Sequence, residues 1–211
     1  MPRLLLLALL AALVALPGCG GGDDEATPED RAGTATQPAP SPGGDRGEAR
    51  GLPVEGTGYT LRAPAGWDDH SDDAEHFQAA GLEPDVVLAG APREGFAANI
   101  NVLRQEGLPD GVDVERFADV SHEALRKASD ELTRSLQPSD ISEVRELELD
   151  GEEARAFDYS GESRGVGLRF RQVFAVRDGA GYIVTYTDRR EAFDEGAEVL
   201  DAVLATWDWE E

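Results

Sequence analysis

Residues 166–177, VGLRFRQVFAVR, decide the fold. Hydrophobic side chains recur at every second position, which is the period of a β-strand with two distinct faces. One face carries Val166, Leu168, Phe170, Phe174 and Val176. The opposite face carries Arg169, Arg171 and Val173. The turn residues 178–181, DGAG, lead into a second hydrophobic strand at residues 182–187, and strands joined by so short a turn must be antiparallel.

A β-hairpin is predicted just before this stretch. Residues 141–149 and 152–159 flank the pair Asp150–Gly151, and Asp-Gly is a strong signal for a two-residue turn between antiparallel strands. The sequence therefore predicts a meander of four consecutive strands.

Three earlier stretches also have strand character, at residues 58–64, 85–91 and 97–104. In the last of them Asn99 and Asn101 share one face, opposite the apolar residues. These two asparagines either line a polar cleft or lie on the outer face of an edge strand, and the sequence does not distinguish the two.

Two amphipathic helices complete the pattern. Residues 113–136 have helical spacing, with Asp113 as N-cap and Pro138 preventing continuation. Its apolar stripe is Val114, Phe117, Ala118, Ser121, Leu125, Ala128 and Leu132. A final helix is expected to start near Asp188, with Glu191 as its capping partner. Its stripe is Phe193, Gly196, Leu200, Val203, Leu204 and Trp207.

Helices with one apolar stripe need sheet faces to cover, so residues 51–211 are predicted to form an α+β domain, an antiparallel sheet sandwiched by helices. Of the three tryptophans, Trp67, Trp207 and Trp209, each lies beside an apolar segment and is expected in the core or at its rim.

In their order, these elements resemble the PsbP-like fold, which includes the LpqN-like envelope lipoproteins of mycobacteria. The resemblance covers residues 52–211 and rests on the segments PAGW at 64–67, NINV at 99–102, the long helix, the hairpin at 150–151 and GYIVTY at 181–186. It implies a helix-covered sheet and non-enzymatic binding of partners. It transfers no site residue, because no functional motif is held in common.

The first residues have the layout of an export signal. Arg3 supplies a positive charge, residues 4–16 are apolar, and residues 16–19 read LPGC. Thirteen residues at about 1.5 Å each cover about 20 Å, too little for a hydrocarbon core of about 30 Å. The segment resembles bacterial lipoprotein signals, although Pro17 replaces the usual Ala or Ser. The alternatives are an ordinary signal peptide with a chance cysteine, or a short anchor helix.

The lipoprotein interpretation makes residues 1–18 a removable signal peptide and Cys19 the lipidation site. A diacylglyceryl group on Cys19 would hold the protein in the lipid bilayer of the cell membrane, on the extracytoplasmic face, because two acyl chains anchor firmly. Cys19 is the only cysteine, so no thiol remains for a disulfide, a metal site or a nucleophile.

Residues 19–50 follow as the lipidated cysteine and a linker. The stretch after Cys19 lacks apolar periodicity, so it is expected to be disordered, with a reach of about 30 Å as a flexible coil. This segment is either a tether that holds the domain away from the bilayer or a spacer whose length is not under selection. The formal net charge of −24 repels phosphate backbones and argues against nucleic-acid binding.

Three short segments partly match known chemical motifs. Residues 161–165, GESRG, fit G-x-S-x-G around Ser163, but a strand follows and all histidines precede the serine, so a hairpin loop is expected. His122–Glu123 begins like H-E-x-x-H, but Arg126 replaces the second histidine. Residues 70–76 combine His70, Asp72, Asp73, Glu75 and His76, which are possible ligands for a divalent cation but more often form a solvated loop.

We therefore expect a non-catalytic binding or scaffolding domain for an envelope protein partner, without a cofactor or resident metal. The alternative is an extracytoplasmic lipoprotein that binds a small ligand or a divalent metal. The sequence does not name the partner, the ligand or the oligomeric state.

Overall fold

The computed structural model describes residues 51–73, 83–127, 136, 138–163 and 165–211. Residues 1–50, which hold the predicted signal peptide, the predicted lipidation site Cys19 and the predicted linker, lie outside the described residues, so these three remain predictions. The elements are β1 (Pro53–Gly56), β2 (Tyr59–Arg62), β3 (Asp68–Asp69), β4 (Val86–Ala89), β5 (Asn99–Gln105), α1 (Val114–Lys127), β6 (Arg145–Leu149), β7 (Glu152–Ser163), β8 (Val166–Arg177), β9 (Ala180–Arg189), α2 (Phe193–Leu204) and β10 (Asp208–Trp209).

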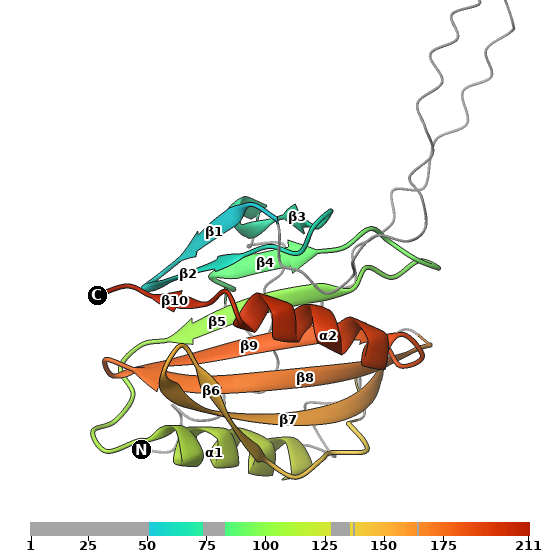
Figure 1. The fold of residues 1–211 in the computed structure, drawn as a ribbon. Helices are drawn as coiled ribbons and strands as arrows, with labels where there is room; N and C mark the ends of the chain where they lie inside the picture. Colours follow the sequence, from blue (N-terminus) through green and yellow to red (C-terminus); the bar gives the residue numbers. More distant parts are fainter. Residues whose placement is uncertain (1–50, 74–82, 128–135, 137, 164) are drawn as a thin grey trace, which may run out of the picture.

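Seven strands form one antiparallel sheet in the order β3-β4-β5-β9-β8-β7-β6. Helix α1 packs on β7 and β8, and α2 packs against β9 and β8 on the opposite face (Figure 1). A small antiparallel sheet, β1-β2-β10, lies on the α2 side and joins the first described strand to the last. The predicted α+β sandwich is confirmed, with this second sheet as an addition.

The core under α1 is aromatic. Phe117 of α1 packs edge-on against Phe174, with ring centroids 5.6 Å apart, and Phe174 stacks on Phe157 at 5.3 Å. The predicted stripe of α1 is buried at every position that the structure describes. Asp113 caps the helix, because its Oδ1 accepts the Arg116 backbone N–H at 2.8 Å.

A cluster of four aromatic rings holds the small sheet to the large one. Tyr59 of β2 stacks on Trp207 with centroids 4.0 Å apart, and Trp209 packs against Tyr182 of β9 at 4.9 Å. The Trp209 indole N–H donates to the Leu149 carbonyl at 3.0 Å. The predicted core placement of Trp207 and Trp209 is confirmed.

Several predicted details hold and others do not. The Asp150–Gly151 turn joins β6 to β7, with φ of 47° and 80° at the two residues, as such a turn requires. The predicted start of the last helix near Asp188 is wrong. Pairing with β8 carries β9 through Arg189, and α2 begins at Phe193 after an N-cap at Ala192 that makes no side-chain cap.

The position of Asn99 and Asn101 is also settled. Strand β5 lies between β4 and β9, so the edge-strand alternative is wrong. Both asparagines are buried on the face opposite Ile100 and Val102. Among the described residues, no helix is both long and apolar enough to cross a membrane.

The aromatic cluster yields a stability prediction. Replacing Trp207 by Ala removes the ring that stacks on Tyr59, and the free energy of unfolding is expected to fall by about 3–5 kcal/mol. Urea unfolding followed by far-ultraviolet circular dichroism measures it. Leu52→Ala is the control, because Leu52 is 80% exposed. An equal effect of the two changes would contradict the assigned role of Trp207.

Candidate functional site

The described motif residues His122 and Ser163 lie on different elements, α1 and β7. Ser163 is buried at the end of β7 and pairs with Val166 of β8, so the motif lies in a β-hairpin and not between a strand and a helix. His122 lies on α1, with its Nε2 2.8 Å from the Ser142 carbonyl oxygen. The hairpin interpretation of Ser163 agrees with this geometry.

The proposed cation loop is only partly described. The His70 backbone N–H donates to the Val87 carbonyl at 2.8 Å, while Glu75 and His76 lie outside the described residues. Within the described part of the chain, no three His, Cys, Asp or Glu side chains are grouped to hold a metal.

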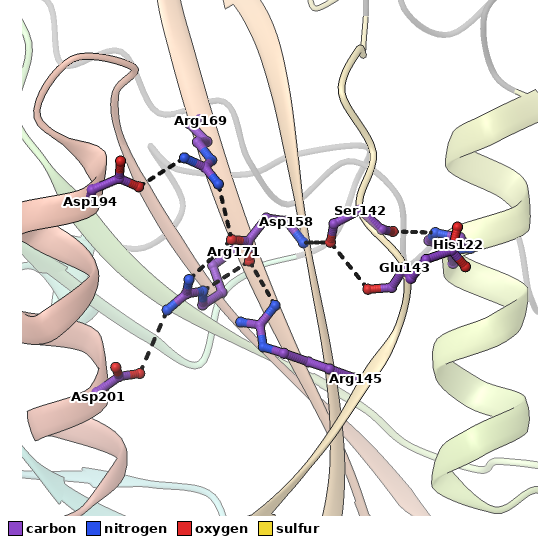
Figure 2. Close-up of polar contacts among 9 residues, drawn as sticks. All are labelled: His122, Ser142, Glu143, Arg145, Asp158, Arg169, Arg171, Asp194 and Asp201. Carbon is purple, nitrogen blue, oxygen red and sulfur yellow. Dashed lines mark hydrogen bonds and ion pairs between the residues drawn. The ribbon is translucent and has the colours of Figure 1, made fainter.

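A charged cluster lies on the α2 face of the sheet instead. Three guanidinium groups point at the buried Asp158 carboxylate of β7 (Figure 2). Arg171 donates twice, from Nε to Oδ1 at 2.9 Å and from Nη2 to Oδ2 at 3.0 Å. Arg145 donates to Oδ1 at 3.2 Å, and Arg169 Nη2 lies 3.5 Å from Oδ2. The Asp158 carboxylate is thus surrounded by cationic donors.

The same arginines connect the sheet to α2. Arg169 donates to Asp194 at 2.9 Å, and Arg171 lies 3.7 Å from Asp201, both on α2. The Arg169 guanidinium also lies over the Phe193 ring, 4.7 Å from its centroid. Three aspartates thus balance three arginines, and the cluster clamps α2 to the sheet.

The protonation of Asp158 follows from these contacts. Burial raises the pKa of Asp158, but the hydrogen bonds and positive charges of Arg171 and Arg145 outweigh burial and hold that pKa below its ordinary value. Asp158 is therefore a carboxylate with its oxygens occupied, which suits a structural role and not a proton donor or acceptor in catalysis.

A groove of about 400 Å³ lies on the other side of α2. Pro64, Ala65 and Trp67 form one wall. The connection between β4 and β5 forms another, from Gly90 to Phe96. Tyr186 belongs to the sheet beneath, and Ala98 lies just before β5. The N-cap residue Ala192 also lines the groove, and α2 contributes Glu195, Gly196, Val199 and Ala202. Three segments that are distant in sequence, residues 64–67, 90–98 and 186–202, therefore build one concave surface.

Charged and aromatic groups line this groove. Arg189 forms ion pairs with Glu94 and Glu191. The Tyr186 hydroxyl donates to Asp188 Oδ2 at 2.8 Å, and the Arg189 backbone N–H donates to Oδ1 at 2.7 Å. Burial and the Asp188 carboxylate raise the pKa of Tyr186, so the phenol keeps its proton. The groove can therefore offer aromatic surface and carboxylate acceptors to a bound group.

Sequence reasoning missed both the Asp158 cluster and the groove. The one available signal for the cluster was the pair Arg169 and Arg171 on a strand face that also carries Val173. For the groove, the sequence named Trp67 as core or rim, and it lies half-buried in the groove wall. Asp188, Glu191 and Gly196 also line the groove, but the sequence named them only as parts of the last helix.

The Asp158 cluster yields a pH prediction. Asp158→Asn removes the buried anion shared by three partly exposed arginines, and the free energy of unfolding at pH 7 is expected to fall by about 1–3 kcal/mol, as for lost hydrogen bonds to a charged group. Because the folded pKa is depressed, the contribution of Asp158 is fully present above its ordinary pKa and is lost as pH falls through the folded value. The difference between wild type and variant should therefore shrink between pH 7 and strongly acidic pH.

Urea unfolding at both ends of that range measures this difference. Glu153→Gln, an exposed change on the same strand, is the matched control for lost charge. A difference that does not vary with pH would refute the assigned ionisation of Asp158.

Comparison with known proteins supports the fold. No protein-family model matches the chain, and no curated protein matches it significantly. The solved structure of cyanobacterial PsbP (CyanoP) from Synechocystis sp. PCC 6803 is similar to this one, with a TM-score of 0.56 and 16% sequence identity over 81% of this chain and 98% of that chain.

Two other solved structures are also similar. LpqN, involved in cell envelope biogenesis of Mycobacterium tuberculosis, has a TM-score of 0.49 and 12% identity, covering 77% of this chain and 86% of that chain. The protein PA94 from Pseudomonas aeruginosa, of unknown function, has a TM-score of 0.46 and 19% identity over 74% and 94% of the two chains. On the likeness to cyanobacterial PsbP, this chain has the PsbP-like fold predicted from its sequence.

Proposed function

We propose that this chain is a membrane-anchored extracytoplasmic lipoprotein whose domain, residues 51–211, is a non-catalytic binding module for an envelope protein partner. Lipid on Cys19 would anchor it, and residues 20–50 would separate the domain from the bilayer. The proposal combines the export-type sequence at residues 1–19 with the groove beside α2.

The groove is the observation that carries the binding role. It is concave, and its lining combines Trp67 and Tyr186 with carboxylates and guanidinium groups. Binding sites typically have this composition, aromatic surface with a few placed polar groups. Ser163 and Asp158 support the non-catalytic part, because the first lies in a hairpin and the second is occupied by arginines.

The partner would be recognised through polar and aromatic contacts. Leu52 is the one exposed large hydrophobic side chain among the described residues, so the surface that they form offers no extended apolar patch. A small ligand is the second candidate, because the volume of about 400 Å³ falls within the usual range of small-molecule sites.

Lipidation is tested at the cysteine. In the native organism, mass spectrometry of the wild-type protein should find an N-terminal Cys19 carrying a diacylglyceryl group, and the protein should sediment with membranes. Cys19→Ser should release the protein from membranes and leave its thermal unfolding unchanged. A wild-type product that retains Met1, or whose terminus carries no lipid, would disprove the anchor.

The partner is tested by photo-crosslinking in the native envelope. A photoreactive residue at Ala91, which lies exposed in the groove wall, should give one discrete protein adduct. The same residue at the exposed Glu153 should not give that adduct. Identical adducts from both positions, or none at Ala91, would count against a protein partner in the groove.

A further inference from the structure

The side of α2 that lines the groove is apolar. Ala192, Gly196, Val199 and Ala202 follow one another at helical spacing, so they lie along one side of α2 and its N-cap. Between the first and the last of these residues a helix advances about 15 Å. The groove is therefore elongated along α2, and small side chains keep it open.

Trp67 provides the aromatic wall of the groove. Its side chain is half-buried and packs, like Ala98, against the core under α2. A Cβ at Gly90 would lie 3.2 Å from Trp67 Cε2, so the indole can lie against this backbone because residue 90 has no side chain. A Cβ at Gly196 would lie 1.7 Å from the Tyr186 hydroxyl oxygen, so the phenol fits beneath α2 for the same reason. The indole is thus a fixed aromatic surface beside an apolar helix face.

Ionic groups of the groove gather near the N-terminus of α2, where they pair with one another. Arg189 forms ion pairs with Glu94 and with Glu191, which lies two residues before α2. A charged ligand would compete with these pairs, whereas an uncharged ligand leaves them as they are. The groove therefore favours an occupant without charge that offers apolar surface to Trp67.

The chain enters the domain at the other end of the groove. The Gly51 backbone N–H donates to the Ala63 carbonyl at 3.0 Å, and Pro64, the next residue, lines the groove. The Arg62 backbone N–H donates to Thr206 Oγ1 at 2.9 Å, which places this corner beside the C-terminus of α2. The chain that precedes Gly51 therefore joins the domain next to the groove.

A short segment before this entry point has a restricted backbone. Residues 38–42 read PAPSP and lie outside the described residues. Each proline fixes φ at about −65°, and a residue that precedes a proline favours extended or polyproline II conformations. The sequence thus favours polyproline II, which rises about 3.1 Å per residue, so the five residues span about 15 Å. This length matches the groove along α2.

We propose that residues 38–42 dock in the groove beside α2 as a polyproline II segment whose proline rings pack on Trp67. Such segments bind aromatic-lined grooves at a low entropic cost, because their backbone is already confined. The segment has no ionisable side chain, so it leaves the ion pairs of Arg189 intact. Residues 43–50 connect it to Gly51 and reach up to about 30 Å, about twice the length of the groove.

A docked segment would occupy the site that a partner needs. Because the segment is joined to the domain, its effective concentration at the groove is about millimolar, and a partner must compete with it. If Cys19 is anchored, a pull on the tether would withdraw the segment before the force reaches Gly51. This regulation of partner binding rests on the proposed function, whereas the docking itself does not.

The test is photo-crosslinking within the purified mature chain from position 19, carrying Cys19→Ser to keep it free of lipid. A photoreactive residue at Ala91, exposed in the groove wall, should form an adduct within one chain. Mass spectrometry of the digested protein should map this adduct to residues 38–42 or their immediate neighbours. The same photoreactive residue at Glu153, exposed on β7, should not give it.

A matched pair of linker variants distinguishes docking from chance contacts of a tethered chain. Replacing Pro38, Pro40 and Pro42 by Ala removes the rings that pack on the indole, so docking and the adduct yield should fall about ten-fold. Pro28→Ala removes a linker proline outside the segment and should leave the yield unchanged. Trp67→Ala should also lower the yield, with circular dichroism as the check that the variant folds.

Equal yields from the triple variant and from Pro28→Ala would overturn the proposal, because the contact would then reflect the tether alone. An adduct between two chains, or none at Ala91, would overturn it as well. If the linker adduct is absent while the partner adduct persists in the envelope, the docking is wrong and the binding role stands. If the linker adduct forms and no partner adduct appears, the docking stands and the proposed function fails.

Discussion

The structure depends on a sheet that is covered on both faces. Its central strands must therefore place alternate side chains in two different cores. Strand β8 shows how one sequence does this. Phe170 and Phe174 enter the aromatic core under α1, while Val173 joins the core under α2. Arg169 and Arg171 share the face of Val173, where Asp158 of the neighbouring strand supplies the opposite charge. Without that carboxylate, Arg169 and Arg171 would keep only Asp194 and Asp201 of α2, both largely exposed, as ionic partners.

The arrangement of the two helices follows from this division. Helix α1 brings an aromatic side chain, Phe117, to the aromatic face. Helix α2 packs Phe193, Leu200 and Val203 on the other face. Two of its aspartates, Asp194 and Asp201, pair with Arg169 and Arg171, the same arginines that contact Asp158. Apolar packing and ion pairing therefore hold α2 on the sheet together.

The sequence predicts well those elements whose pattern is long and regular. The alternation of residues 166–177 matches β8 at both ends, the Asp150–Gly151 turn joins the strands expected, and the α1 stripe is buried where it is described. The short strands β1, β3 and β10 were missed, because two to four residues are too few to show a period. The start of α2 was misplaced because strand pairing with β8 overrides the local capping pattern at Asp188.

The candidate site was beyond sequence reasoning for a physical reason. Trp67, Glu94, Asp188 and Glu195 come from separate segments and share no spacing that a motif could express. Gly90 and Gly196 look like ordinary loop and helix glycines until the rings beside them are seen. The cluster around Asp158 similarly depends on the register that places Asp158 opposite Arg171.

The way the chain enters the domain has a mechanical consequence. Gly51 donates its N–H to the Ala63 carbonyl at 3.0 Å, and β1 then pairs along one side with β2, as the outer strand of the small sheet. If the protein is held at Cys19 as proposed, tension on the tether acts on the open end of this hairpin. Its hydrogen bonds would break one after another, starting at Gly51, while β2 stays held by β10 on its other side. Under tension, β1 would therefore separate from β2 first and add its length to the tether. The seven-stranded sheet would bear the force only after that.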